Sequence, residues 1–221
     1  MNNTGRFITF EGGEGGGKST QSKLLKAAFA ENNIKAILTR EPGGTKGAEQ
    51  IRELLVKGSV NKWDAITETL LHLAARQDHI RNLISPSLTE GKVVICDRFC
   101  DSTVAYQGYA HGLGLATVDV LQRQIISEFM PDLTFILDIE IRDGISRAKK
   151  RGDNENRYEL MGKFFHTKVR EGFLDIASKE PKRCFVINAD DTIENIHEQI
   201  INITNKQLNL SLIKANVKAA I

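Results

Sequence analysis

Five short apolar segments are spaced along the chain, and the longer segments between them have a helical repeat. The short segments cover residues 6–10, 35–39, 92–96, 133–138 and 183–187. They are rich in Val, Ile and Phe and are bounded by Gly, Pro or charged residues, which is typical of buried strands. The pattern therefore predicts five strands.

The segments between the predicted strands place apolar side chains three or four residues apart, the repeat of amphipathic helices. Near-continuous apolar strands that alternate with such helices predict an α/β fold, with a parallel sheet covered by helices on both faces. Ligands of such sheets bind at the carboxyl ends of the strands. Residues after about 205 alternate only weakly, and we assign them to no element. The predicted helical faces are Leu24, Leu25, Ala28 and Phe29; Ile51, Leu54 and Leu55; Ile66, Leu70, Leu73 and Ala74; Val118, Leu121, Ile125 and Ile126; Val169, Phe173, Leu174 and Ala177; and Ile193, Ile196, Ile200 and Ile201.

Composition narrows the class of protein. The sequence of 221 residues has no stretch rich in Pro, Gly and Ser, or in charge, that is typical of a linker between domains. We therefore expect a single domain over residues 1–221. The 30 basic and 28 acidic side chains leave no broad basic face for nucleic acid. The three cysteines, Cys96, Cys100 and Cys184, include no CxxC pair, which argues against a disulfide framework or a zinc site. No segment resembles a signal peptide or a membrane span, and we expect a cytoplasmic protein with no membrane partner.

A glycine-rich segment follows the first predicted strand and precedes a predicted helix. Residues 10–21 read FEGGEGGGKSTQ and contain the pattern GxxxxGKS. A loop with few side chains lets backbone N–H groups surround phosphate oxygens, and the helix N-terminus adds positive potential. Lys18 can reach the β- and γ-phosphates, and Ser19 can offer its hydroxyl to Mg²⁺.

This segment predicts a P-loop NTPase fold. The alternative is a flexible glycine turn before a helix, but chance matches to the motif seldom have a strand before them and a helix after them. The predicted ATP-binding residues are Gly12, Gly13, Glu14, Gly15, Gly16, Gly17, Lys18, Ser19 and Thr20.

The third predicted strand runs into two charged side chains in the sequence ICDRF. Asp97 can hold or orient Mg²⁺ near a triphosphate, and Arg98 can clamp a further phosphate. We therefore predict Ser19 and Asp97 as metal ligands, and Lys18 and Arg98 as catalytic residues. The alternative is a surface salt bridge at a strand end.

Positive charge is concentrated around Gly152 in the sequence SRAKKRGDNENRYE. Charge runs are often solvated helix faces, and that alternative stays open. In an enzyme that transfers phosphoryl groups, such a segment can close over the site, exclude water and neutralise charge. We predict a lid over about residues 142–158, with Arg147 and Arg151 as catalytic residues. The basic residues of this segment are Arg147, Lys149, Lys150, Arg151 and Arg157.

Residues 61–64, NKWD, match the NKxD pattern by which GTPases recognise guanine. No apolar strand precedes them, and no Asp in the chain has Gly three residues later. We expect these residues to lie near a helix start, with Asp64 as the N-cap. A GTP-dependent switch is therefore the weaker interpretation.

Five segments follow one another in a fixed order along the chain: FEGGEGGGKSTQ, TREPGGT (39–45), LLHLAARQDHI (70–80), CDRFCDSTVAYQG (96–108) and the basic lid. Together they closely resemble the thymidylate kinase family over about residues 7–201. The resemblance implies five parallel strands, ATP with Mg²⁺ as the phosphate donor, dTMP as the acceptor and a homodimer. Since Glu14 stands in the P-loop and the cations stand in the lid, the chain is similar to the bacterial type.

The resemblance also implies acceptor-binding residues. Arg76 matches an arginine that bonds a thymine carbonyl, and Arg98 matches the clamp on the dTMP phosphate. Tyr106 matches a tyrosine packed near C2′ of the sugar. His72 stands where the family usually has a phenylalanine stacked on thymine, and an imidazole ring can stack in the same way. The full set implied is Glu14, Glu41, Arg52, Leu55, His72, Arg76, Arg98, Ser102, Thr103, Tyr106 and Gln107.

The sequence leaves three functions to separate. One is transfer of the γ-phosphate of ATP to dTMP, which gives dTDP for dTTP synthesis. A kinase for another nucleoside monophosphate would share the loop and the lid and differ in the base pocket. A P-loop nucleotide switch would share the loop but would release ADP without need of an acceptor.

Overall fold

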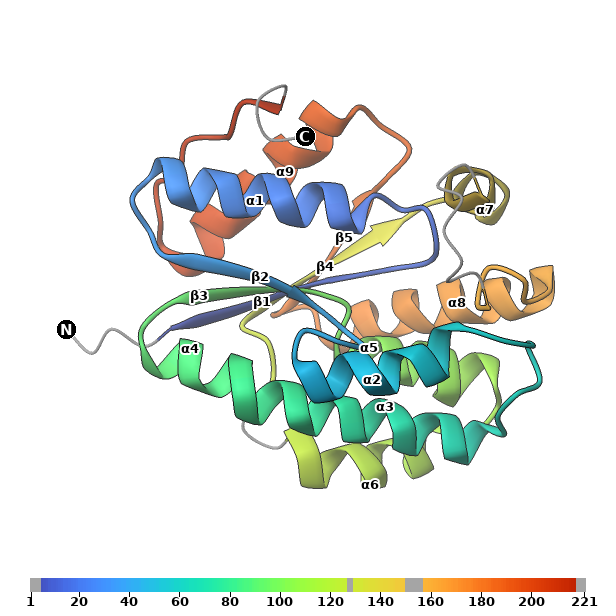
Figure 1. Ribbon diagram of the computed structural model, residues 1–221. Helices are drawn as coiled ribbons and strands as arrows, with labels where there is room; N and C mark the ends of the chain where they lie inside the picture. The colour runs from blue at the N-terminus through green and yellow to red at the C-terminus, as the bar shows by residue number, and fades with distance from the viewer. Residues whose placement is uncertain (1–4, 127–128, 150–156, 218–221) are drawn as a thin grey trace.

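The computed structural model describes residues 5–126, 129–149 and 157–217. Its centre is a five-stranded parallel sheet that lies between two layers of helices (Figure 1). All five strands lie within one residue of the predicted boundaries. They are β1 (Arg6–Glu11), β2 (Ala36–Arg40), β3 (Val93–Asp97), β4 (Leu133–Asp138) and β5 (Cys184–Asn188).

The strand order is β2-β3-β1-β4-β5, so β1 is the central strand. It pairs with β3 on one side and with β4 on the other. Connections from the middle of such a sheet leave toward opposite sides, which opens a crevice at the carboxyl ends of the strands. Phe10 of β1 pairs with Asp97 of β3. The glycine-rich loop and the Asp97–Arg98 pair therefore begin side by side.

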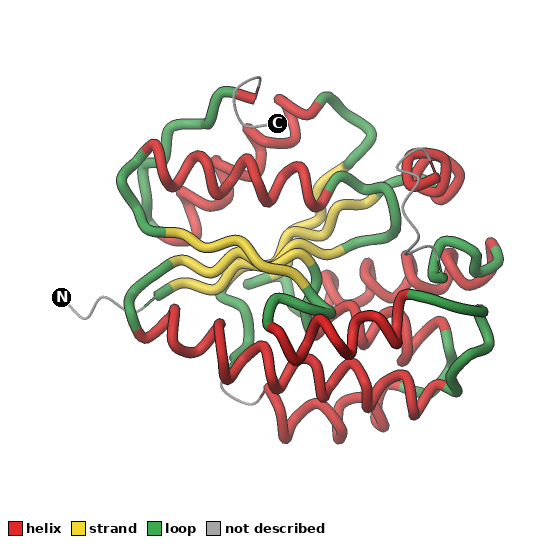
Figure 2. The backbone as a smooth tube through the Cα atoms, in the orientation of Figure 1, coloured by secondary structure: helices red, strands yellow, loops and turns green. Residues whose placement is uncertain are grey.

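Helices cover both faces of the sheet, as predicted (Figure 2). One layer consists of α1 (Lys18–Glu31) and α9 (Ile193–Leu208). The other layer contains α2 (Lys46–Val56), α3 (Ala65–His79), α4 (Ser85–Thr89), α5 (Cys100–Thr103), α6 (Leu115–Ile126) and α8 (Lys163–Lys179). The short α7 (Ile141–Lys149) follows β4 at the carboxyl edge. Two π-helical stretches, η1 (Ile80–Ile84) and η2 (Val104–Ala110), continue α3 and α5.

Successive side chains of a strand point to opposite sides of the sheet. Because the strands are apolar at nearly every position, both faces of the sheet are apolar. Ile8 and Phe10 of β1 pack in the cluster beneath α1 and α9. Phe7, the residue before Ile8, points to the opposite side and packs in a separate cluster on the other face. The chain after α9 returns to the first cluster, where Leu212 and Ala215 are buried. Of the residues after about 205, to which the sequence assigned no element, the first belong to α9, and Leu212 and Ala215 contribute to the core.

Helix α3 differs from its predicted burial pattern. Ile66 and Leu70, which the apolar repeat placed on the inner face, are 50% and 49% exposed. Glu68, Arg76 and His79 are buried instead. These polar groups find hydrogen-bond partners inside the protein, which removes much of the cost of burying them. The inner face of α3 therefore carries these polar groups beside Leu73, which is buried as predicted, and the rest of the predicted apolar face lies at the surface.

The NKWD segment lies where the sequence indicated. Asp64 is the N-cap of α3, and its carboxylate accepts a hydrogen bond from the backbone N–H of Thr67 at 2.8 Å. This bond satisfies one of the unpaired N–H groups of the first helical turn. In the described part of the chain, no helix combines the length and the apolar composition that crossing a bilayer requires.

Candidate active site

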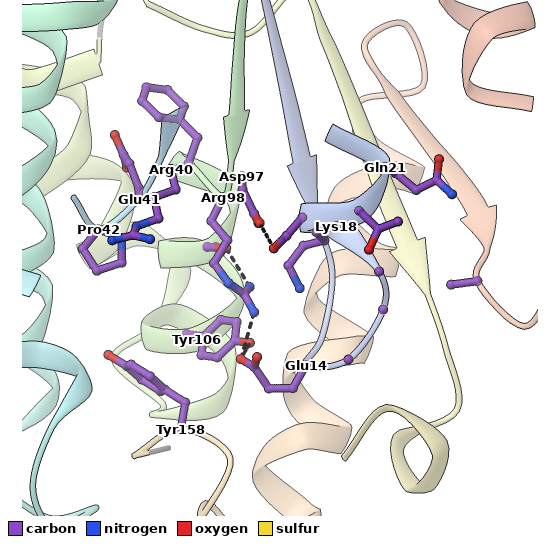
Figure 3. A pocket seen from close by; sticks show the side chains of 18 of the residues that line it. Glu14, Lys18, Gln21, Arg40, Glu41, Pro42, Asp97, Arg98, Tyr106 and Tyr158 are labelled. Atoms are coloured by element: carbon purple, nitrogen blue, oxygen red, sulfur yellow. Dashed lines mark hydrogen bonds and ion pairs between the residues drawn. The ribbon is translucent and has the colours of Figure 1, made fainter. Parts of the chain in front are cut away.

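A cavity of about 760 Å³ lies at the carboxyl ends of the strands. Its walls come from the loop after β1, the segments after β2, β3 and β5, and helices α2, α3 and η2. This volume is within the range typical of sites for small organic ligands. Figure 3 shows that residues from distant parts of the sequence converge on it.

Most of the residues singled out by the sequence line this cavity. They are Glu14, Gly15, Gly16, Gly17, Lys18, Ser19, Thr20, Glu41, Arg52, His72, Arg76, Asp97, Arg98, Ser102, Thr103, Tyr106, Gln107 and Arg147. Gly12 and Gly13 border a small adjacent cavity on the other side of the loop. Leu55 is fully buried beside the main cavity, and its neighbour Val56 forms the wall there. Arg151 lies outside the described residues.

The glycine-rich loop needs glycine for internal packing as well as for a ligand. A Cβ atom on Gly12 would lie 2.4 Å from the carbonyl oxygen of Leu137, and one on Gly15 would lie 2.0 Å from that of Gly144. Both glycines also have positive φ angles, 126° and 69°, which other residues rarely adopt. The loop therefore packs directly on the backbone of β4 and α7.

Lys18 lies inside the curve of this loop. Its ammonium group donates to the carbonyl oxygens of Gly12 at 3.2 Å and Gly13 at 2.6 Å. Burial, together with the nearby positive charge of Arg98, lowers the pKa of Lys18 from 10.5 to about 8. The ammonium is still mostly protonated at pH 7, and its charge faces the loop interior.

Ser19 and Asp97 meet at the start of α1. The hydroxyl of Ser19 donates to a carboxylate oxygen of Asp97, the contact drawn as a dashed line in Figure 3. Both side chains offer oxygen ligands, which Mg²⁺ prefers, and Mg²⁺ usually takes one or two protein ligands beside phosphate oxygens and water. The described residues contain no cluster of three or more His, Cys, Asp or Glu side chains that could hold a metal alone. The pair therefore fits Mg²⁺ bound together with a nucleotide.

Arg98 is held at the centre of the cavity wall. One terminal nitrogen donates to the carbonyl oxygen of Gly12 at 3.0 Å and lies 3.2 Å from the hydroxyl of Ser102, and the other donates to Glu14 at 2.8 Å. The hydroxyl of Tyr106 donates to the same Glu14 oxygen at 2.8 Å. The backbone of Arg98 has a φ of 68°, in the left-handed region. The guanidinium thus joins the loop to α5, and Glu14 links it to Tyr106 of η2.

Arg76 lines the cavity but is almost completely buried. It donates to Glu41 at 2.7 Å, to Gln122 at 2.9 Å and to the hydroxyl of Thr103 at 3.1 Å. The second oxygen of Glu41 lies 3.0 Å from Nδ1 of His79. The burial of Glu41 opposes ionisation, but Arg76 and His79 together hold its pKa below the ordinary value. The Arg76 guanidinium is therefore rigidly oriented before a ligand arrives.

The lid cations divide into two groups in the structure. Arg147, at the end of α7, lines the cavity and donates to the carbonyl oxygen of Ala189 at 3.1 Å. Arg157 is 0% exposed and does not line the cavity. It pairs with Glu68, so it is not a surface cation of the lid as the sequence suggested. Lys150 and Arg151 lie outside the described residues.

Several residues that sequence reasoning missed also form the site. Tyr158 and Glu159 line the cavity directly after Arg157, and the segment after β5 closes the far side with Ala189, Asp191, Thr192, Ile193 and Ile196. The rule that ligands bind at carboxyl ends of parallel strands would have found the second group. No comparable rule indicated Tyr158 and Glu159, which stand beside a run of charged residues in the sequence.

Glu11, at the end of β1, is a further missed residue. Its carboxylate accepts hydrogen bonds from the backbone N–H of Phe99 at 2.8 Å and from the hydroxyl of Ser102. Burial, reinforced by Asp101, raises the pKa of Glu11 from 4.5 to about 7. An acidic residue at the end of a buried strand was the available signal. Its contacts fix the segment that carries Arg98.

The parallel sheet has a phosphate-binding loop after its central strand. An acidic side chain lies beside that loop, and an arginine faces both. This arrangement is typical of P-loop phosphotransferases. Arg76, Gln107 and Tyr106 line the same cavity. Fold and site together define a P-loop nucleoside monophosphate kinase.

Comparisons with known proteins agree on the family. The family model described as thymidylate kinase matches residues 10–200. The thymidylate kinase of Caulobacter vibrioides is 45% identical over 206 residues, which cover 93% of this chain and 99% of the relative. That of Wolbachia pipientis wMel is 48% identical over 202 residues, which cover 89% and 98%. The crystal structure of thymidylate kinase from Ehrlichia chaffeensis is 39% identical and has a TM-score of 0.72, with 90% of this chain and 98% of that chain covered.

The chain belongs to the thymidylate kinase family. It is therefore a transferase, a kinase of nucleotide biosynthesis that binds ATP, and the P-loop switch is excluded. The predicted fold class, the five-stranded P-loop sheet, is confirmed.

Proposed function

We propose that the chain transfers the γ-phosphate of ATP to dTMP through the residues that line the 760 Å³ cavity. The observation that carries the proposal is that one cavity holds both the glycine-rich loop and the Arg76–Gln107 end. A phosphate oxygen of dTMP attacks the γ-phosphorus, and the bond from that phosphorus to the bridging oxygen of ADP breaks. Since a phosphate monoester is already anionic near neutral pH, positioning and charge neutralisation suffice, and no strong general base is needed.

The donor occupies the loop side of the cavity. Backbone N–H groups of residues 12–19 surround the phosphates, and Lys18 reaches the β- and γ-phosphates. Ser19 and Asp97 hold Mg²⁺, which neutralises charge on the phosphates when it is bound. The donor base lies against the wall that Ala189, Asp191, Thr192, Ile193 and Ile196 form.

The acceptor occupies the other side. Arg98 clamps its phosphate, and Arg147 and Arg151 neutralise charge on the transferring group. Arg76, His72 and Gln107 surround the base. The complete acceptor set is Glu14, Glu41, Arg52, Leu55, His72, Arg76, Arg98, Ser102, Thr103, Tyr106 and Gln107, with Leu55 acting from behind the cavity wall through Val56.

Acceptor choice tests the function. We expect dTMP to be preferred over dUMP by about tenfold, because one methyl group in an apolar pocket is worth only about 1–3 kcal/mol. Cytosine nucleotides should be far poorer, because cytosine places an amino donor opposite the guanidinium of Arg76. ADP release with dTMP, dUMP, UMP, CMP, dCMP, AMP and GMP measures this order. Equal turnover of dCMP and dTMP would instead assign the site to another base.

His72 makes a prediction about acid stability. Burial lowers the pKa of His72 from 6.5 to about 4. The unfolded chain therefore takes up a proton at this residue below about pH 6.5, and the folded chain does so only near pH 4, so the native state loses stability as pH falls through this window. His72→Phe removes the effect and keeps an aromatic face for the base. Its unfolding free energy should rise relative to that of the unmodified protein between about pH 6.5 and 4.

Urea unfolding at several pH values measures the difference, and dTMP titration checks binding. A free-energy difference that does not change with pH would contradict burial of a neutral imidazole. Weakened dTMP binding in His72→Phe would show that the ring hydrogen-bonds the base rather than stacks on it.

We also propose a homodimer. Leu54, Ile66, Leu70 and Val120 are 43–67% exposed on α2, α3 and α6, helices that lie in the same layer. Large apolar side chains exposed on neighbouring helices are typical of an interface, so a second copy of the chain is the occupant we assign to this surface. Light scattering should give twice the mass of one chain, and a mass of one chain would reject the dimer.

A cytoplasmic location fits the chemistry of the chain. Cys96, Cys100 and Cys184 are all free and buried. Three unpaired thiols without disulfides are typical of reducing compartments. Fractionation of the native cells would test this location.

A further inference from the structure

Arg157 fixes the connection between α2 and α3. Its Nε donates to the carbonyl oxygen of Ser59 at 3.0 Å, Nη1 to that of Leu55 at 3.2 Å and Nη2 to that of Val60 at 3.0 Å. Ser59 and Val60 belong to this connection, and Leu55 belongs to the last turn of α2. The carbonyl oxygen of Ser59 also accepts a hydrogen bond from the backbone N–H of Lys62 at 3.1 Å. The guanidinium therefore ties the connection to the end of α2. With all three nitrogens engaged and its side chain fully buried, Arg157 holds the protein and does not face a phosphate.

The same guanidinium forms an ion pair inside the protein. Nη1 of Arg157 lies 2.5 Å from Oε2 of Glu68 on α3, and both side chains are 0% exposed. Glu68 also accepts a hydrogen bond from Nε2 of Gln107 at 2.7 Å, and Nε2 of His111 lies 3.2 Å from it. Burial opposes ionisation of Glu68, but His111, His72 and Arg157 lower its pKa to about 2. The carboxylate is therefore charged at neutral pH.

An ionised carboxylate fixes which way a neighbouring amide points. It can only accept hydrogen bonds, so Gln107 must turn its NH₂ group toward Glu68. The amide oxygen of Gln107 is then directed away from Glu68. Gln107 lines the cavity, so this choice sets the hydrogen-bonding character of the cavity wall. A neutral amide at position 68 would accept either orientation of Gln107.

Arg157 also places its neighbour in the same wall. Tyr158 lines the cavity, and its hydroxyl lies 3.0 Å from Nε2 of His72. Its ring meets Tyr106 edge-on, with centroids 5.5 Å apart. The Arg157 guanidinium lies 5.2 Å from the centroid of the Tyr158 ring. The buried pair therefore supports two adjoining parts of the acceptor side, one through Gln107 and one through Tyr158.

We propose that the Arg157–Glu68 pair is a positioning element of the acceptor site, which fixes the amide of Gln107 and the ring of Tyr158 without touching the transferred phosphate. The proposal rests on the proposed function, in which this side of the cavity binds dTMP. It predicts that damage to the pair weakens acceptor binding more than it slows the chemical step.

Glu68→Gln is the main test, because it keeps the shape of the side chain and removes the charge. We expect KM for dTMP to rise about tenfold, kcat to change less than about threefold and KM for ATP to stay the same. Arg157→Lys keeps a positive charge beside Glu68, but its single nitrogen cannot reach the three carbonyl groups and Glu68 together as the planar guanidinium does, and it should raise KM for dTMP by a smaller factor. Arg147→Gln, an arginine of the cavity rim, is the matched control and should lower kcat instead.

A double variant separates positioning from folding. If Glu68 acts through Gln107, then Glu68→Gln should raise KM for dTMP less than about twofold when Gln107 is already alanine. Partial unfolding of a sample lowers apparent kcat and leaves KM unchanged, so an unstable variant still gives a decisive KM. An unchanged KM in both Glu68→Gln and Arg157→Lys, or independent effects in the double variant, would overturn the proposal. Failure of the unmodified protein to phosphorylate dTMP would instead reject the proposed function.

Discussion

Lys18→Ala should lower kcat about 100-fold or more, because it removes a cation that contacts charge developing on the phosphates. Lys18 lies inside the loop of residues 12–19, and its two hydrogen bonds go to carbonyl oxygens of that loop. Its lowered pKa shows that burial of its charge is unfavourable in the absence of a phosphate. Its loss should therefore leave stability nearly unchanged, within about 4 °C in Tm.

Lys23→Ala is the matched control, since Lys23 is an exposed lysine of the same helix. It should have the kcat of the unmodified protein. Turnover of dTMP by saturating ATP measures kcat, and calorimetry measures Tm. Near-normal turnover by Lys18→Ala would contradict the assignment of the loop, whereas a large fall in Tm would show that Lys18 serves mainly to hold the loop together.

Arg98→Ala should lower kcat/KM for dTMP by about 10²–10³, because one side chain would lose both its contact to the acceptor phosphate and its hold on Glu14. KM for ATP should change little. The φ of 68° at this position is as unfavourable for alanine as for arginine, so the backbone strain is the same in both proteins. The loss can therefore be attributed to the guanidinium.

Arg98→Lys is the companion variant. It restores a positive charge but not the planar fork that bonds two oxygens at once. We expect it to recover less than about tenfold of the lost activity. Full recovery would mean that charge alone matters, and equal losses with ATP and dTMP would place Arg98 on the donor phosphates.

Strands and the phosphate-binding loop could be predicted because each depends on local sequence. Strands β1, β3 and β4 are buried on both faces, and the edge strands β2 and β5 are partly buried. Their apolar runs therefore stand out from the amphipathic helices. The loop is set by glycines at fixed positions, and Gly15 has no room for a side chain against Gly144. Neither feature requires knowledge of which distant residues come together.

Helix α3 shows where the same rule fails. The apolar repeat assumes that the inside of a protein is apolar, but α3 faces a polar cavity whose walls include Arg76 and His72. Ile66 and Leu70 are consequently turned outward. The apolar repeat of α3 therefore includes side chains that lie on the surface that we assign to a second subunit.

Arg157 could not be separated from its basic neighbours by sequence. Five cations within eleven residues look alike until their partners are known. The partner Glu68 is 89 positions away in the chain. It belongs to α3, and the apolar repeat of that helix predicts its polar residues to face solvent. A long-range ion pair leaves no local pattern, which is why the division of the lid cations emerged only from the fold.

The apolar cluster between the sheet and α1 is completed by residues from both ends of the chain, Ile8 and Phe29 on one side and Leu212 and Ala215 on the other. Ribosomes add about 5–20 residues per second, so Phe29 is made roughly ten to forty seconds before Leu212. During that interval the part of this cluster that α9 and the residues after it complete stays open to water. Closure of this half of the protein therefore waits for the last part of the chain to be synthesised, and chaperones that bind exposed apolar surface have that time to act on the nascent chain.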